Sequence, residues 1–90
     1  MVYLALEPRA AVEAIRLAND TGCFVWVGSD ALTSEEHKRF TLDGTKLTRF
    51  SYPLANATPE VIADALGTIE EHHPGETVWV QHVRSIVLAE

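Results

Sequence analysis

The stretch Cys23-Phe24-Val25-Trp26-Val27 decides the fold, because its centre occurs twice in the chain. Val25-Trp26-Val27 follows a helix-like run over 8–22, and Val78-Trp79-Val80 follows a second helix-like run over 59–75. Both runs begin with proline, which suits the first turn of a helix because no N–H is needed there. The duplication predicts two related βαβ halves. It says little about activity.

Composition indicates an ordinary globular protein. The chain has 90 residues, of which 47% are hydrophobic and 22% are charged, so we expect a single domain. Its parts are a first half (1–28), a connecting turn and hairpin (29–45) and a second half (46–90). No apolar run approaches the ~20 residues that span a bilayer, and the first residues do not resemble a signal peptide. We therefore expect a cytoplasmic protein with no membrane partner.

The net charge is −6, and the basic residues are unevenly distributed. The segment 37–52 contains one acidic residue and four of the basic ones, which are Lys38, Arg39, Lys46 and Arg49. This segment carries +3, which leaves −9 for the rest of the chain. An acidic body with one basic segment favours solubility and the steering of a partner over general nucleic-acid binding.

The first half predicts a strand, a helix and a second strand. Val2–Leu6 is rich in β-forming residues, and the helix that follows ends at Gly22, which suits a left-handed cap. The strand Cys23–Val27 lacks polar alternation, so both of its faces should be covered. If it lies at a sheet edge, a second subunit would cover it, so we expect a homodimer through Cys23–Val27.

The connecting segment supports two interpretations. Thr33-Ser34-Glu35-Glu36 has the form of a capping box, which would start a helix over 34–42. In contrast, Lys38–Leu42 alternates between polar and apolar residues, and Asp43-Gly44 is typical of a two-residue hairpin turn. We favour the hairpin, with at most one helical turn before it.

The second half repeats the order of the first. Thr45–Tyr52 predicts a strand that Pro53 ends. Thr58 is a suitable N-cap for a second helix, and Thr77–Val83 predicts the last strand.

The repeated order predicts an α+β fold, the ferredoxin-like split βαβ sandwich, with an antiparallel sheet and two helices on one face. The alternative is a small three-layer parallel α/β fold, which requires a helix at Ser34. The hairpin signal favours the sandwich. Neither fold assigns a function, because each hosts many.

A metal site is not favoured by the sequence. His72, His73 and His82 lie near two glutamates, but adjacent histidines at a helix end point in different directions. Histidines at that position complement the negative end of the helix. Cys23 is the single cysteine and lies in an apolar run, which is typical of a small buried residue. We expect no metal and no other cofactor.

Two groups of residues remain as candidate binding sites. Gly28, Ser29 and Asp30 follow an apolar strand directly, and parallel α/β folds bind ligands at such ends. The turn lacks the glycines and lysine of a phosphate-binding loop, and it also fits an ordinary polar turn. His82 and Tyr52 complete this candidate ligand site.

The second group is the basic segment, where Lys38, Arg39, Lys46 and Arg49 alternate with aromatic residues. Cations beside sheet aromatics are typical of proteins that bind single-stranded RNA, but the aromatic consensus is missing and the acidic body repels a polyanion. An acidic protein patch or a small anionic ligand suits the segment as well. Trp26 is expected in the core or, if exposed, at an interface.

These observations favour a small non-enzymatic module that docks on a protein partner, in a regulatory or inhibitory role. Acidic charge with one basic segment would orient the encounter. One alternative is a small-molecule sensor or a small dimeric enzyme with a cavity between sheet and helices. A weaker alternative is binding of single-stranded nucleic acid through 38–52.

Overall fold

The fold was analysed in a computed structural model, which describes residues 1–81. Strands and helices alternate along the chain, and the connecting segments are short except for 50–58. The elements are β1 (Val2–Ala5), α1 (Pro8–Thr21), β2 (Phe24–Val27), α2 (Ser34–Leu42), β3 (Leu47–Arg49), α3 (Pro59–His72) and β4 (Val78–Gln81). No helix within residues 1–81 is long and apolar enough to cross a membrane.

The four strands form one sheet in the order β3-β2-β1-β4, and every neighbouring pair is parallel. Tyr3 of β1 lies opposite Val25 on one side and Trp79 on the other. The two Val-Trp-Val strands therefore flank β1. The two tryptophans nevertheless point to opposite faces of the sheet, because Trp26 lies opposite Leu4 and Trp79 lies opposite Tyr3.

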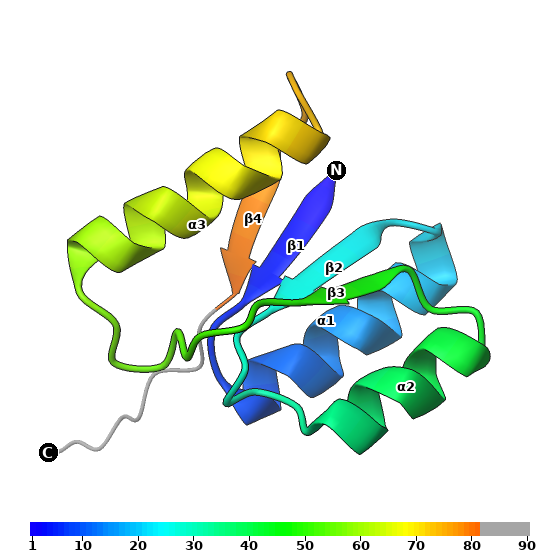
Figure 1. The fold of residues 1–90 in the computed structure, drawn as a ribbon. Coiled ribbons are helices and arrows are strands. Elements are labelled where there is room, and N and C mark those ends of the chain that lie inside the picture. Colours follow the sequence, from blue (N-terminus) through cyan, green and yellow to red (C-terminus); the bar gives the residue numbers. More distant parts are fainter. Residues whose placement is uncertain (82–90) are drawn as a thin grey trace, which may run out of the picture.

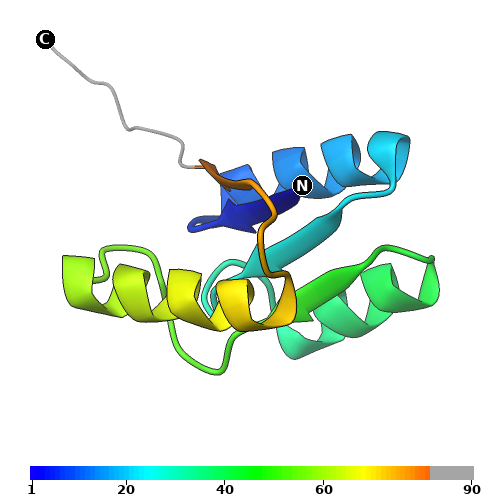
Figure 2. The same cartoon turned by 90° about the horizontal axis from the view of Figure 1, so that it is seen from above.

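Helices cover both faces of the sheet. α1 and α2 lie on one face, and α3 lies on the other (Figures 1 and 2). The core is divided accordingly into two layers, because successive side chains of a strand point to opposite faces. Alanines of α1 pack with Val25 and Val27 in the first layer, while Val2, Leu4 and Trp26 pack with Ala65 and Ile69 of α3 in the second.

The ends of α1 and α3 follow the sequence signals. α1 begins with Pro8 and ends at Gly22, whose φ of 76° is left-handed and whose N–H donates to the carbonyl of Ala18. α3 begins after Thr58, whose hydroxyl accepts a hydrogen bond from the Val61 N–H. These sequence predictions are confirmed.

The predicted hairpin is wrong. Residues 34–42 form α2, and Thr33 and Glu36 make both hydrogen bonds of a capping box. Asp43 and Gly44 end this helix, and Gly44 has a φ of 97°. A positive φ serves a helix end as well as a hairpin turn, which is why the two residues did not distinguish the alternatives.

The ferredoxin-like antiparallel sandwich is also wrong, and α2 is the physical reason. The helical crossover between β2 and β3 brings the chain back to the end of the sheet where β2 begins, so β3 runs parallel to β2. The alternative three-layer parallel α/β arrangement fits the structure.

The strand Cys23–Val27 does not lie at an edge. β2 pairs with β1 on one side and with β3 on the other. Its backbone groups are used within the sheet, and Val25, Trp26 and Val27 are buried. The prediction of a homodimer through this strand is therefore wrong, although the expectation that both faces of the strand are covered is confirmed.

A close backbone approach fixes the turn that follows β2. Gly28 is buried, and a Cβ there would lie 2.8 Å from the backbone nitrogen of Leu54 and 2.9 Å from Oδ1 of Asp30. Since backbone cannot move aside as a flexible side chain can, a side chain at this position forces the two segments apart.

We expect Gly28→Ala to lower the free energy of unfolding by about 2 kcal/mol, as overpacked sites do. Gly67→Ala is the matched control, because a Cβ at Gly67 meets nothing within 4 Å in α3. That control should raise the free energy of unfolding by about 0.5–1 kcal/mol through helix propensity. Urea unfolding measures both, and equal effects of the two substitutions would contradict the close approach at Gly28.

Candidate functional site

Two hollows lie at the carboxyl end of the sheet. The Arg49 hollow, of about 580 Å³, lies between the start of α1 and the β2–α2 turn, with a lining that includes Ser29, Asp30 and Arg49. The Tyr52 hollow, of about 550 Å³, lies between the segment 52–58 and the first turns of α3. Both volumes are in the range of ligand sites, about 300–1,000 Å³.

Most of the polar groups that line the Arg49 hollow form hydrogen bonds within the protein. Arg49 donates from Nε to the carbonyl of Leu32 (2.8 Å) and from Nη2 to the carbonyl of Ser29 (3.0 Å). Thr33 and Glu36 are engaged in the capping box. These contacts hold the β2–α2 turn against β3. We therefore interpret the polar groups of this hollow as support for the fold.

The segment 50–58 carries the chain from β3 to the opposite face of the sheet, and Asp30 fixes its course (Figure 1). The two carboxylate oxygens of Asp30 accept hydrogen bonds from the backbone N–H groups of Leu54 (3.1 Å) and Ala55 (3.2 Å). The Ser29 N–H donates to the carbonyl of Tyr52 (3.0 Å). These three hydrogen bonds join the turn after β2 to the crossing segment 50–58, and the Phe50 N–H donates a fourth to the carbonyl of Val27 (2.8 Å).

Local geometry completes the crossing segment. Leu54 is buried in the second core layer, and its carbonyl accepts a hydrogen bond from the Ala57 N–H (3.2 Å). Asn56 lies inside this turn with a φ of 61°, a conformation that asparagine tolerates better than most residues. The segment is therefore shaped by contacts within residues 1–81 and needs no ligand to form.

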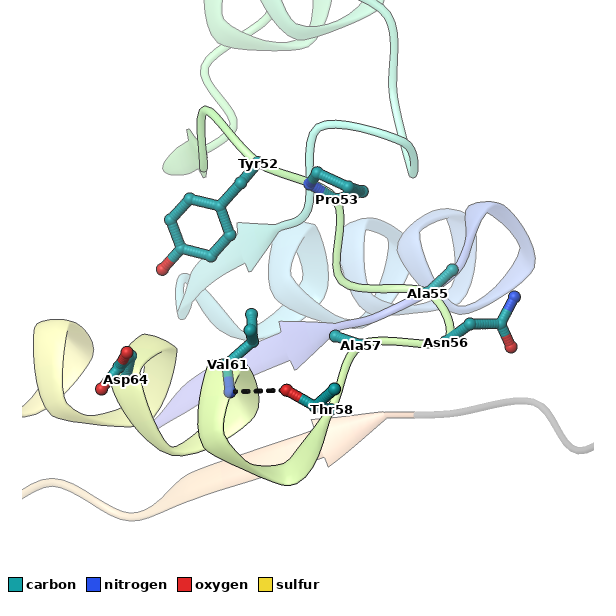
Figure 3. A pocket seen from close by; sticks show the side chains of 8 residues that line it. All are labelled: Tyr52, Pro53, Ala55, Asn56, Ala57, Thr58, Val61 and Asp64. Atoms are coloured by element: carbon teal, nitrogen blue, oxygen red, sulfur yellow. Dashed lines mark hydrogen bonds between the residues drawn. The ribbon is translucent and has the colours of Figure 1, made fainter.

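The lining of the Tyr52 hollow is mostly apolar. Pro53, Ala55, Ala57 and Val61 supply small apolar surfaces, and Tyr52, Asn56, Thr58 and Asp64 supply the polar groups. Figure 3 shows Tyr52 and Asp64 at one end of the hollow and Ala55 and Asn56 at the other. This arrangement gives the hollow one end with an aromatic ring and a carboxylate.

A row of aromatic rings holds Tyr52 in place. The ring of Phe50 packs against Tyr52 with centroids 5.1 Å apart, and against buried Trp26 at 5.2 Å. Such tilted pairs contribute about 0.5–1.5 kcal/mol beyond the area they bury. The Tyr52 ring is therefore held in its orientation by packing that extends from the core through Phe50.

Tyr52 and Asp64 retain free polar groups. Within residues 1–81, neither the Tyr52 hydroxyl nor the Asp64 carboxylate has a hydrogen-bond or ion-pair partner, whereas the Thr58 hydroxyl caps α3. Tyr52 is half-buried and Asp64 is exposed. The two groups can therefore contact a molecule that enters the hollow.

In the structure, the residues of the predicted ligand turn hold neighbouring segments of the backbone together. Gly28 permits the close approach to Leu54, while Ser29 and Asp30 hold the crossing segment. Tyr52 belongs to the neighbouring hollow, on the other side of that segment. His82 lies outside the described residues.

The basic residues do not form a common surface on a hairpin. Lys38 and Arg39 are exposed on α2, with the Arg39 guanidinium 5.5 Å from the Phe40 ring centroid. Lys46 donates to the carbonyl of Gly22 (3.3 Å), and Arg49 is held by the β2–α2 turn. Phe50, one of the aromatic residues of this segment, is buried in the core and is not exposed for stacking on a nucleic-acid base.

His72 and His73 lie at the opposite end of the sheet from the hollows. His72 and His73 end α3 and pack their rings near Trp26, at 5.3 and 6.0 Å between centroids. Within residues 1–81, no group of three or more His, Cys, Asp or Glu side chains could hold a metal ion. Glu76 lies at the same end, and its pKa is lowered mainly because it accepts a hydrogen bond from the N-terminal ammonium group.

Sequence reasoning missed Asp64 and Val61 as site residues. Both belong to α3, where the helical pattern places Asp64 toward water and Val61 in the apolar stripe. No local signal links them to Tyr52, because their common place in the lining of the hollow depends on the path of the crossing segment. The one feature of the sequence that pointed to this region was Tyr52 followed by Pro53 at the end of the predicted strand.

Comparison of the chain with protein-family models, curated proteins and solved structures found no match.

We expect Asp30→Ala to lower the free energy of unfolding by about 1–2 kcal/mol, because two backbone donors lose a charged acceptor. Asp43→Ala is the matched control, since the Asp43 side chain is exposed at the end of α2. That control should stay within about 0.5 kcal/mol of the unsubstituted chain. Urea unfolding of both variants checks this, and equal stabilities would show that Asp30 does not hold the segment.

Proposed function

We propose that this domain binds a small molecule in the Tyr52 hollow. The observation that carries the proposal is a hollow of about 550 Å³, mostly apolar, in which the Tyr52 hydroxyl and the Asp64 carboxylate have no hydrogen-bond or ion-pair partner within residues 1–81. Ligand sites typically combine an apolar lining with a few polar groups that orient the ligand. A small-molecule sensor or carrier is the function class that this combination favours.

The position of the hollow supports the same conclusion. Open parallel sheets bind ligands outside the carboxyl ends of their strands, and the crossing segment lies at that end. The segment is also shaped in advance by Asp30, Leu54 and Thr58. A preformed site binds more tightly than a flexible one, because less ordering accompanies binding.

We expect compounds from a small-molecule library to shift the backbone amide NMR signals of residues 52–64. Val61→Phe should abolish these shifts by filling the hollow, since Val61 is half-buried in its lining. Val12→Phe is the matched control: it places the same ring on α1 beside the Arg49 hollow.

Three outcomes separate the explanations. Shifts lost in Val61→Phe and kept in Val12→Phe support the proposal. Shifts lost in Val12→Phe alone would assign binding to the Arg49 hollow, and the absence of specific shifts anywhere would contradict small-molecule binding. Circular dichroism of both variants establishes that each is folded.

Protein binding is a second candidate function, favoured by the edge strand β4. Among residues 1–81, β4 pairs only with β1, and its Trp79 and Val80 side chains are 58% and 44% exposed. Its sequence, Val78-Trp79-Val80-Gln81, has no charge and no proline, the usual protections of an edge. The other edge, β3, has three residues and ends with Arg49.

A second copy of the chain is the partner that β4 suits. Two β4 strands related by a twofold axis can pair antiparallel without placing like charges opposite each other, although each chain carries −6. This proposal moves the dimer interface from Cys23–Val27 to β4. A regulatory role would then depend on the assembled dimer.

We expect the sedimentation coefficient of the chain to rise with concentration, and Trp79→Lys to keep it monomeric, because a charge at the pairing edge is costly to bury. Thr48→Lys, an exposed position on β3, is the control and should dimerise as the unsubstituted chain does. Monomeric behaviour of the unsubstituted chain at all concentrations would rule out this interface.

A further inference from the structure

The charge of the Tyr52 hollow restricts what it can bind. Asp64 is its one charged lining residue, and no basic side chain is among the lining residues. The chain as a whole carries −6. An anion would meet repulsion from Asp64 without a compensating cation, whereas a cation would meet a carboxylate that has no partner within residues 1–81.

Tyr52 adds a second group that favours a cation. Its ring lies at the same end of the hollow as Asp64 (Figure 3). A cation over an aromatic face is attracted by the ring electrons, more strongly where water is partly excluded. The Phe50 ring packs against the Tyr52 ring with centroids 5.1 Å apart, which holds Tyr52 in its orientation before binding.

The lining of the hollow suits an organic cation better than a metal ion. Metal sites need several converging ligands, and within residues 1–81 no group of three suitable side chains exists. Apart from Asp64, the wall next to Tyr52 is formed by Pro53, Ala57 and Val61. This wall suits an apolar body attached to the charged group.

From these observations we infer that the ligand is a small protonated amine with an apolar body. The ammonium group pairs with the Asp64 carboxylate and contacts the Tyr52 ring, while the body packs on Pro53, Ala57 and Val61. This inference rests on the proposed small-molecule function. It adds the chemical class of the ligand and the residue that selects it.

Three probes with the same phenyl ring and two-carbon linker test the inference with the full chain. Phenethylamine, 2-phenylethanol and 3-phenylpropanoate present a positive, a neutral and a negative head on the same ring and linker. Titration followed by amide NMR shifts of residues 52–64 gives their affinities. We expect the amine to bind at least about fivefold more tightly than the alcohol, the combined effect of an ion pair and a cation–π contact, and the acid to bind most weakly.

Asp64→Asn should lower the preference for the amine by removing the ion pair, while the cation–π contact with Tyr52 remains and the alcohol binds unchanged. Glu71→Gln is the matched control, because it removes the same charge from an exposed position on the same helix, outside the hollow. A preference that falls equally in both variants would assign it to net charge and overturn the role of Asp64.

The outcomes separate this inference from the proposed function. If the alcohol or the acid binds as tightly as the amine, the ligand class is wrong and the hollow remains a binding site. If none of the three probes shifts residues 52–64, both the ligand class and the binding function are contradicted.

Discussion

A parallel sheet must be covered on both faces, and this constraint shapes the rest of the molecule. α1 and α2 connect β1, β2 and β3 along one face, which leaves the face of Val2, Leu4 and Trp26 to be covered by α3. The chain must therefore cross from one face to the other after β3, outside the carboxyl ends of the strands. The segment 50–58 makes that crossing, and the candidate site is formed by it (Figures 1 and 3).

A crossing segment of this kind needs partners for its backbone, since it runs outside the sheet. Gly28 lets it approach β2 closely, and Asp30 accepts hydrogen bonds from Leu54 and Ala55. Leu54 anchors the segment in the core, and the row of rings from Trp26 to Tyr52 connects that core to the hollow. Gly28, Ser29 and Asp30, which the sequence suggested as a ligand turn, thus hold the crossing segment in place. The charged group of the proposed ligand site, Asp64, comes instead from α3.

Sequence patterns predicted the elements better than their arrangement. Pro8, Gly22 and Thr58 marked helix ends correctly because those signals are local. Lys38–Leu42 was misassigned because five alternating residues fit a strand and a helix equally, and one extra helix converts an antiparallel pairing into a parallel one. The Tyr52–Asp64 proximity was out of reach for the same reason, as it follows from the path of the crossing segment.

The central claim is that the crossing segment is fixed before any ligand binds, and amide hydrogen exchange of the ligand-free chain tests it most directly. The N–H groups of Leu54 and Ala55, which donate to Asp30, should exchange much more slowly than those of Asn56 and Thr58 in the same segment. Asp30→Ala should remove that difference. Exchange of Leu54 and Ala55 as fast as that of their neighbours in the unsubstituted chain would contradict a preformed hollow.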